Sequence, residues 1–492
     1  MEEFMFKVKE FGAAGDGITK DTAAIQAAID AASAAGGGIV FLDPGTYLTG
    51  SIFLKSYVTL EFSPGSTLKG SPDIADYPRQ FFAQSISLHE PDYQWHHLII
   101  ATNAEYVTIR GSGVIDGSGP AFWHKGQFPP RKWIGYDVPR IEKMLIFYQC
   151  KNVRIQDVTL FNSPAWHLHI LECDRVWIQG VSVDGRLFGP NVDGIDVQGS
   201  ADVFISDCRF ECGDDAIVMF TTPNRGCERV TVTNCTFRTN CVAFKAYINI
   251  ESKHAIRDLV FTNSVIWRST RAVALYLFAH SLIENVLVSN IVCDTESHYH
   301  LNRPLQIDCK RASSGSAVVE SHSPVPRGRV RNVQFSNVVC RTDGRILLTA
   351  ADDMRIENVV LRDVRMSYPT IDDPSVTAKN VESDQFANHS PEARVARAAL
   401  AADGVDGLYV DNLQVEWPTK DNKWIRWDGL QNEEGKPRPY IRGEDVKAGD
   451  EPPFSVGWFR KCTKVLLNCP FAEQNGNVKK YETVDTEIDV IR

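Results

Sequence analysis

A short motif recurs through the chain at intervals close to 27 residues, and this repeat restricts the possible folds more than any other feature. Nine segments share it: IQDVTL, IQGVSV, ISDCRF, VTNCTF, FTNSVI, VSNIVC, FSNVVC, LRDVRM and VDNLQV. Their third residues are Asp157, Gly180, Asp207, Asn234, Asn263, Asn290, Asn337, Asp363 and Asn412, so the successive spacings are 23, 27, 27, 29, 27, 47, 26 and 49. A constant period built from short β runs is typical of stacked repeats.

The repeat predicts an all-β fold, a right-handed parallel β-helix. The Asn and Asp column is expected to form a ladder of turns in which each side chain hydrogen-bonds the next coil, and the apolar column after it points inward. A leucine-rich repeat has a similar period but needs a Leu-x-x-Leu-x-Leu frame that is absent. The two long gaps are one coil plus insertions near 296–328 and 367–406. The first contains Tyr299, His300, Arg303, Asp308 and Lys310, and the second is helix-prone, with PEARVARAALAAD.

The ends of the chain read as caps. Asp21 can cap a helix from about Thr22 to Ala35, which is rich in Ala and stopped by three glycines, and the helix would cover the open end of the solenoid. We expect a single catalytic domain over residues 1–492. Its parts would be an N-terminal cap at about 1–50, a solenoid at about 51–417, and a C-terminal extension or cap at 418–492.

Charge and cysteine usage exclude several classes of protein. A formal charge of −10 and a pI near 5.7 argue against nucleic-acid binding. No apolar run reaches the ~20 residues that span a bilayer, so no membrane partner is expected. The N-terminus has no signal-peptide pattern, which predicts a cytoplasmic protein, or a periplasmic or secreted one if a leader was removed. The twelve cysteines include no C-x-x-C pair. Buried thiols are favoured, with disulfides as the alternative, and no metal or cofactor is expected.

Three aspartates stand out between residues 190 and 220. Asp193 opens one apolar strand pattern and Asp215 opens the next, 22 residues later, with Asp214 directly before it. If the coils stack, the three carboxyl groups gather at one edge. Mutual repulsion then raises the pKa of the less solvated group, which favours one protonated acid beside ionised bases. The alternative is that they are turn residues that only satisfy backbone groups.

The same strand pattern continues in the next two coils, as NCVAFK from Asn240 and RAVALY from Arg271. One surface strip would then carry the acids together with Asn240, Lys245, Arg271 and Tyr276, which are the candidate substrate-binding residues. An exposed β face with snorkelling side chains is the alternative for Lys245, Arg271 and Tyr276. A polar strip edged by aromatic rings suits a carbohydrate chain, so an oligosaccharide or polysaccharide is the expected partner.

The chain resembles glycoside hydrolase family 28, the polygalacturonase-like inverting hydrolases. The resemblance rests on FGAAGDGITKDTAAIQAAIDAA, GGGIVFLDPGTYLTG, GVIDGSG, NSPAWHLHI, NVDGID and GDDAI, and it runs to about residue 300. It implies that Asp214 is the general acid, while Asp193 and Asp215 activate a water on the opposite face of the sugar. Such single displacement requires carboxyl groups spaced to admit a water.

Two departures from the family pattern bear on the substrate. Thr239-Asn240-Cys241 stands where the family usually has Gly-His-Gly, and Ala274-Leu275-Tyr276 stands where it has Arg-Ile-Lys. Without these two cations the chain lacks the groups that usually bind a uronate carboxylate. The sequence therefore predicts an inverting hydrolase of pectin-related or other plant or algal glycans, other than plain polygalacturonate. A polysaccharide lyase or epimerase and an inactive carbohydrate-binding solenoid are the alternatives.

Two histidine pairs are not assigned to catalysis. His167 and His169 alternate with Trp166 along a strand, which predicts a surface role for both. His96 and His97 are adjacent on a strand and point to opposite faces, which favours a structural role over metal binding.

Overall fold

The structure is a computed structural model that describes residues 4–81, 94–123, 139–248, 254–296, 302–310, 327–342, 344–368, 370–371, 389–396, 398–416, 424–426, 440–442, 455–469 and 481–490. Tyr299 and His300 of the first insertion lie outside them. The chain divides into two compact units, residues 1–239 and 240–492, and each is described by itself. The single-domain organisation stays a prediction. Across the described residues, no helix combines the length and the apolar character that crossing a membrane requires.

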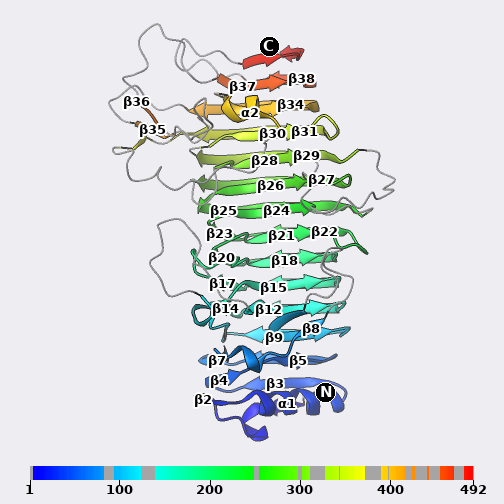
Figure 1. Cartoon of the computed structure of the whole chain (residues 1–492), viewed down its shortest axis with the longest axis vertical. Helices are drawn as coiled ribbons and strands as arrows, with labels where there is room; N and C mark the ends of the chain where they lie inside the picture. Colours follow the sequence, from blue (N-terminus) through cyan, green and yellow to red (C-terminus); the bar gives the residue numbers. More distant parts are fainter. Residues whose placement is uncertain are drawn as a thin grey trace. The chain divides into compact units, whose positions relative to one another are not determined.

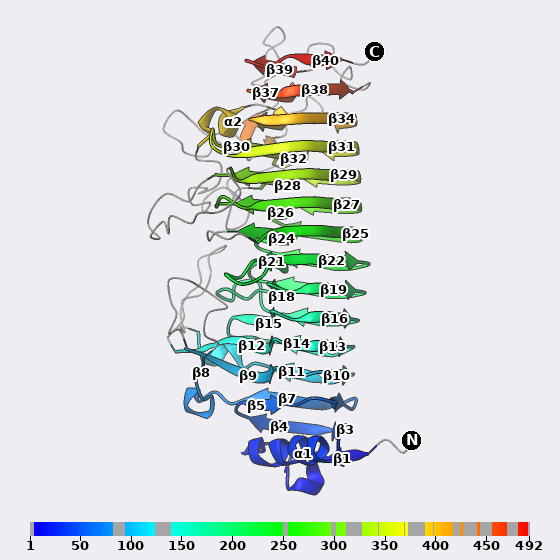
Figure 2. The same cartoon turned by 90° about the vertical axis from the view of Figure 1, so that its right-hand side faces the viewer.

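Both units are built from parallel strands stacked coil on coil, which confirms the right-handed parallel β-helix. In the first unit a full coil carries three short strands. Strands of successive coils lie one above another (Figures 1 and 2). The first strands of the coils form the ladder β5 (Ile52–Leu54), β9 (Gln94–Thr102), β12 (Ile141–Tyr148), β15 (Trp166–Leu171), β18 (Ile195–Gln198) and β21 (Ile217–Phe220).

The remaining strands of the first unit form two further ladders. One comprises β1 (Met5–Lys7), β3 (Gly38–Leu42), β6 (Val58–Phe62), β10 (Thr108–Gly111), β13 (Lys151–Gln156), β16 (Asp174–Gln179), β19 (Ala201–Ser206) and β22 (Cys227–Thr233). The other comprises β2 (Asp16–Lys20), β4 (Gly45–Thr49), β7 (Ser66–Gly70), β11 (Val114–Asp116), β14 (Thr159–Phe161), β17 (Ser182–Asp184), β20 (Arg209–Cys212) and β23 (Thr236–Thr239). A short β8 (Gln80–Phe81) pairs antiparallel with β9, and three 3-10 turns, η1 (Val8–Phe11), η2 (Ile74–Asp76) and η3 (Gly119–Ala121), complete the unit.

Helix α1 (Thr22–Ala34) closes the start of the first unit, as predicted. It packs against β1, β3, β5 and β6 (Figure 1, blue). The helix buries Ile25, Ala28, Ile29 and Ala32. The expected cap differs in detail, because the Asp21 carboxylate does not bond its own helix. It accepts the backbone N–H groups of Ala14 at 2.7 Å and Gly15 at 3.0 Å, so Asp21 ties the preceding loop to the helix start.

Between residues 242 and 416, each described coil of the second unit carries two strands, because the second and third strands of the earlier coils merge into one long strand. The short strands are β24 (Val242–Ile248), β26 (Arg271–Leu277), β28 (Leu305–Cys309), β30 (Ile346–Ala350), β33 (Ala398–Asp403), β37 (Ser455–Arg460) and β39 (Tyr481–Val484). The other strands are β25 (Ile256–Ser269), β27 (Leu282–Thr295), β29 (Arg329–Thr342), β31 (Arg355–Ser367), β34 (Val405–Glu416), β38 (Thr463–Asn468) and β40 (Ile488–Val490). A separate antiparallel sheet joins β32 (Thr370–Ile371), β35 (Trp424–Arg426) and β36 (Tyr440–Arg442).

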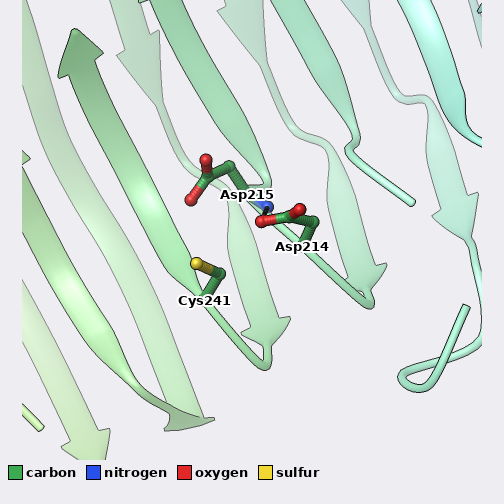
Figure 3. A group of neighbouring side chains, drawn as sticks. All are labelled: Asp214, Asp215 and Cys241. Carbon is green, nitrogen blue, oxygen red and sulfur yellow. Dashed lines mark hydrogen bonds between the residues drawn. The ribbon is translucent and has the colours of Figure 1, made fainter. Parts of the chain in front are cut away.

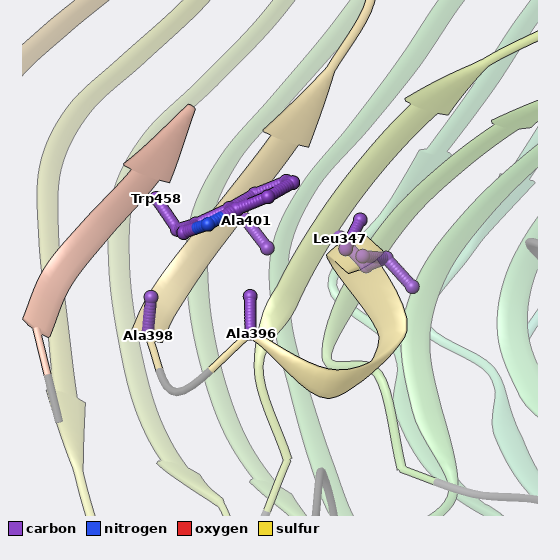
Figure 4. Packing of buried hydrophobic residues seen from close by; sticks show 6 residues of the cluster. Leu347, Ala396, Ala398, Ala401 and Trp458 are labelled. Atoms are coloured by element: carbon purple, nitrogen blue, oxygen red, sulfur yellow. The ribbon is translucent and has the colours of Figure 1, made fainter. Parts of the chain in front are cut away.

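The helix predicted in the second insertion is only partly correct. Residues Pro391–Val395 form α2, but AALAAD, residues Ala398–Asp403, forms β33. All six residues of β33 are buried, and the strand pairs in parallel with β30 and β37. Ala396, Ala398 and Ala401 pack with Trp458 (Figure 4). Two flanking strands and a buried face thus outweigh the helix propensity of alanine.

The predicted turn ladder is confirmed. All nine residues of the column have a positive φ, between 52° and 65°. Side-chain amides of Asn residues in the column bond the neighbouring coil at several steps, for example Asn290 Nδ2 to Asn263 Oδ1 at 2.9 Å and Asn337 Nδ2 to Asn290 Oδ1 at 2.8 Å. Asn and Asp tolerate this left-handed conformation better than other non-glycine residues, which explains their choice here.

A second ladder was not predicted. Its residues also have a positive φ and begin strands one coil apart: Asn152, Arg175, Asp202 and Arg229 in the first unit, and Asp258, Asn285, Asn332 and Asn358 in the second. In the first unit the rungs pair Arg with Asn or Asp, whereas in the second they are amide bonds to a neighbouring Asn or Asp. All twelve cysteines are free thiols and eleven are buried, which confirms the favoured assignment.

Candidate active site

The three predicted acids lie on turns that lead into neighbouring strands of the first unit. Asp193 precedes β18 and Asp215 precedes β21, and Ile195 stands opposite Ile217 in the parallel register. The Gly194 N–H donates to the Asp215 carbonyl at 2.9 Å, which fixes the two turns at equivalent points of successive coils. The structure therefore brings these backbone positions together as the 22-residue offset predicted, while their catalytic roles stay predictions.

The three acidic residues are nearly buried, and one carboxylate oxygen of Asp193 is fully buried. Asp193, Asp214 and Asp215 retain 5%, 7% and 4% of their exposure. A carboxylate oxygen of Asp214 lies within 4.8 Å of one of Asp215, and Figure 3 shows the two side chains on adjacent residues of one turn. The Asp215 N–H donates to Asp214 Oδ1 at 3.0 Å. The two carboxyl groups therefore belong to one compact acidic site at the turn before β21.

A short hydrogen-bond chain positions Asp214. Asn191 Nδ2 donates to Asp214 Oδ2 at 3.4 Å, and Asn191 itself is held in the left-handed region with φ 55°. The buried Arg140 guanidinium donates to Asn191 Oδ1 at 3.1 Å and to the carbonyls of Pro164 and Pro190 at 3.0 and 2.9 Å. The Thr239 hydroxyl donates to the Asp214 carbonyl. Sequence reasoning missed Arg140, because it belongs to no repeat and follows a segment without a motif.

A buried lysine lies in the same ladder, two coils before Asp193. Lys143 on β12 stands opposite Trp166 on β15, and its Nζ lies 3.8 Å from the ring centre of Trp166 and 4.1 Å from that of Trp95. Burial lowers the pKa of Lys143 to about 8, against the attraction of Glu142, Asp196 and Asp193. Asp196, fully buried on β18, was also missed. In both cases the available signal was a charge inside an otherwise apolar strand.

The prediction that His167 and His169 are surface residues is wrong. Both rings are fully buried. His167 Nδ1 bonds the Asp193 carbonyl at 2.7 Å, and His169 Nε2 bonds Gln198 Oε1 at 3.0 Å. Burial lowers the pKa of His167 to about 4 and that of His169 well below its usual value, so both rings are neutral at pH 7. Strand alternation failed as a guide because side chains of adjacent coils cover both faces of this ladder.

His96 and His97 take the structural role that was predicted. His96 Nδ1 bonds the Tyr77 carbonyl at 2.6 Å, and His97 Nδ1 bonds the Lys143 carbonyl at 2.9 Å. Burial lowers the pKa of His97 to about 3.

The four predicted substrate-binding residues belong to the second unit. Asn240 precedes β24, Lys245 lies on β24, and Arg271 and Tyr276 lie on β26. The expectation of an open strip is wrong for two of them, because Arg271 and Tyr276 retain 0% and 1% of their exposure. Lys245 is partly exposed, and its Nζ lies 4.8 Å from the ring centre of Tyr247 and 5.8 Å from that of Tyr276.

Gln306 on β28 forms hydrogen bonds with the buried side chains of Arg271 and Tyr276. Its Oε1 accepts both the Arg271 Nε–H at 3.0 Å and the Tyr276 hydroxyl at 2.9 Å. The Tyr276 ring also stacks on Phe278 with centres 5.8 Å apart. Nothing in the repeat pointed to Gln306, which is an uncharged residue inside a strand. The roles of these residues in binding stay predictions.

Two family models match the sequence. One, described as glycosyl hydrolases family 28, matches residues 80–389, more than half of the chain. The chain belongs to glycosyl hydrolases family 28. The other, described as rhamnogalacturonase A/epimerase, pectate lyase-like, matches residues 5–116. Family 28 membership confirms the resemblance read from the acidic motifs.

Individual relatives support the same family 28 assignment. A probable polygalacturonase of Arabidopsis thaliana is 33% identical over 214 residues, which cover 43% of this chain and 42% of that protein. The chain thus spans about two fifths of the length of this relative. The solved exopolygalacturonase of Thermotoga maritima has a TM-score of 0.62 at 22% identity, covering 76% of this chain and 90% of its own. That of Yersinia enterocolitica has a TM-score of 0.61 at 18% identity, covering 85% and 77%. At these identities the two structures establish the fold.

Proposed function

We propose that this family 28 protein hydrolyses glycosidic bonds of a pectin-related oligosaccharide or polysaccharide by single displacement, with inversion at the anomeric carbon. The observation that carries the proposal is the placement of Asp193, Asp214 and Asp215 on in-register turns with nearly buried carboxyl groups. Clustered acids are costly to bury, so their presence at one point favours a catalytic use.

In this mechanism Asp214 donates its proton to the glycosidic oxygen as the bond from that oxygen to the anomeric carbon breaks. A water attacks the carbon from the opposite face and gives up its proton to Asp193 or Asp215. Asn191 orients the Asp214 carboxyl group, and Arg140 holds Asn191 in place. These two are positioning residues, because neither needs to touch the sugar.

The proposed substrate is a pectic chain other than plain polygalacturonate. The relatives are named polygalacturonases, but Ala274-Leu275-Tyr276 replaces the Arg-Ile-Lys that is typical of the family. Arg271 is committed to Gln306, which leaves Lys245 as the more exposed cation of the predicted strip. A substrate with neutral or substituted sugars beside its uronates would suit this pattern.

The test is hydrolysis of polygalacturonate, methyl-esterified pectin and rhamnogalacturonan oligosaccharides, followed by reducing-end assay and by proton NMR of the newly formed anomer. We expect cleavage of a substituted pectic substrate with inverted configuration, and a loss of about 10²- to 10⁴-fold in kcat for Asp214→Asn. Retained configuration would exclude single displacement. Unchanged turnover after Asp214→Asn would remove the proposed acid.

A lyase reaction is the second candidate, and one observation favours it. Abstraction of the proton next to a uronate carboxylate needs a base, and Lys143 has a pKa lowered to about 8 by burial. Ultraviolet absorbance of an unsaturated product, abolished by Lys143→Met and retained in Asp214→Asn, would favour elimination over hydrolysis.

A further inference from the structure

The proposed hydrolysis does not use the ammonium group of Lys143, which two indole rings of the first unit enclose. The side chain retains 8% of its exposure. Its Nζ lies 4.1 Å from the ring centre of Trp95 and 3.8 Å from that of Trp166. Within the described part of the chain, this group makes no hydrogen bond or ion pair. An ammonium carries three N–H donors, and cation–π contact uses the charge without satisfying them.

The position of Lys143 relates it to the proposed acids. Lys143 stands opposite Trp166 in the register of β12 and β15. Since Leu168 stands opposite Ile195, Trp166 is level with Asp193 on the next coil. Neighbouring coils of a β-helix lie about 4.8 Å apart, which places Lys143 roughly 10 Å from Asp193 along the stack. A ligand group bound at Lys143 would therefore belong to the same carbohydrate chain as the bond to be broken.

We propose that Lys143 is a specificity-determining residue that binds the carboxylate of an acidic sugar of the substrate. The inference rests on the proposed function and adds a substrate feature to it. In this proposal a lysine on an earlier coil binds the uronate carboxylate, in place of the Arg-Ile-Lys motif that the later coils lack. The faces of Trp95 and Trp166 exclude water from the ion pair and strengthen it.

The charged and titratable groups around Lys143 influence the pH range in which its ammonium group can bind a carboxylate. Its pKa of about 8 leaves the group mostly protonated at neutral pH. The groups that face it are Arg140 and Glu142 near its own strand, His97 on β9, His169 on β15, and Asp193 and Asp196 from the coil of β18. Burial lowers the pKa of both histidines, so they stay neutral, and burial raises the pKa of Glu142.

A competing role is electrostatic support of the acids. Lys143 could hold Asp193 and Asp196 ionised without touching the substrate. The two roles differ in one respect, because only direct binding depends on the charge of the sugar. Substrates that differ by esterification of that carboxylate therefore separate them.

The experiment compares a pectic oligosaccharide with its methyl ester, using wild type, Lys143→Met, Lys143→Arg and the exposed control Lys151→Met. For Lys143→Met we expect kcat/KM on the free acid to fall about 10- to 100-fold more than on the ester, chiefly through KM, as for loss of a charge-assisted hydrogen bond. Lys143→Arg should recover part of the difference, and Lys151→Met should show none. Equal losses on acid and ester, or no loss at all, would overturn the proposal.

Two further measurements test the proposal without depending on the folding of a variant or on turnover. With wild type, the KM for the free acid should rise as the pH passes about 8 while that for the ester stays level, which requires no variant to fold. If wild type cleaves neither compound, the proposed hydrolysis fails but the inference is still tested by calorimetric binding. Binding of the acid that weakens tenfold or more in Lys143→Met supports it, and failure of wild type to bind either compound overturns it.

Discussion

The two units place polar side chains differently on their first ladders of strands. In the first unit the acids stand on the turns before β18 and β21, where the backbone groups bond between coils and the acidic residues keep 4–7% of their exposure. In the second unit Arg271, Tyr276 and Gln306 stand inside strands and bond one another. A side chain within a stacked strand has neighbours about 4.8 Å above and below, which tend to cover it. Turns thus leave groups available for chemistry, whereas strand positions favour structure, and Lys143 on β12, which keeps 8% of its exposure, is the proposed exception.

The largest expected effect is on the acids. Asp193→Asn should lower kcat by about 10²- to 10⁴-fold, because the amide can neither orient nor deprotonate the water. Tyr276→Phe should lower kcat less than tenfold, since Gln306 Oε1 still accepts from Arg271. Steady-state kinetics on the best pectic substrate measures both. Asp202→Asn, an exposed acid of the same unit, is the control, and equal losses for Asp193→Asn and Tyr276→Phe would break the comparison.

The next effect is acid sensitivity from the buried histidines of the first unit. Because burial lowers the pKa of His97 to about 3, the unfolded chain binds a proton between about pH 3 and 6.5 that the folded chain does not. The contribution of His97 to the free energy of unfolding is therefore fully present above about pH 6.5. It falls as the pH is lowered, by about 3 kcal/mol at pH 4. His97→Asn keeps a donor near the Lys143 carbonyl and should remove that part of the fall.

Urea unfolding midpoints between pH 7 and 4, followed by tryptophan fluorescence, measure this difference. His280→Asn, at a partly exposed position of the second unit, serves as the control and should leave the pH dependence as in wild type. If His97→Asn and wild type lose stability in parallel, the buried ring is not the source of the acid sensitivity.

A smaller effect concerns the polar cluster of the second unit. Arg271→Met should lower the free energy of unfolding by about 1.5–3 kcal/mol, since it deletes a charge-assisted bond to Gln306 from a buried site. Its KM on the pectic substrate should change less than threefold. The same urea and kinetic measurements apply. A raised KM with an unchanged free energy of unfolding would instead support the substrate-binding role that the sequence predicted for Arg271.

The periodic parts of the molecule could be predicted from the sequence. The Asn and Asp ladder, the inward apolar column and the register of Asp193 with Asp215 all follow from one repeated motif. A repeat carries this information because equivalent residues of successive coils have equivalent neighbours above and below them.

Features without periodicity give a weaker signal in the sequence or none. Lys143, Arg140 and Asp196 become significant only through residues on other coils, so their positions in the sequence give no spacing to read. The second ladder mixes Arg with Asn and Asp, which hides the column. In β33, burial between two strands overrides local helix propensity.

The smallest expected effect tests the ladder itself. Asn290→Gly removes two exposed amide bonds, to Asn263 and from Asn337, but keeps a residue that adopts φ 56° without strain. The free energy of unfolding should fall by about 1 kcal/mol, because water replaces part of each bond. In the first unit Asn234→Gly removes a longer rung, 3.3 Å to Asp207, and a 3.3 Å bond from the Thr233 hydroxyl, and it should cost about half as much. Thermal unfolding followed by circular dichroism compares the two. The opposite order would mean that the left-handed backbone, rather than the side-chain amides, holds the rungs together.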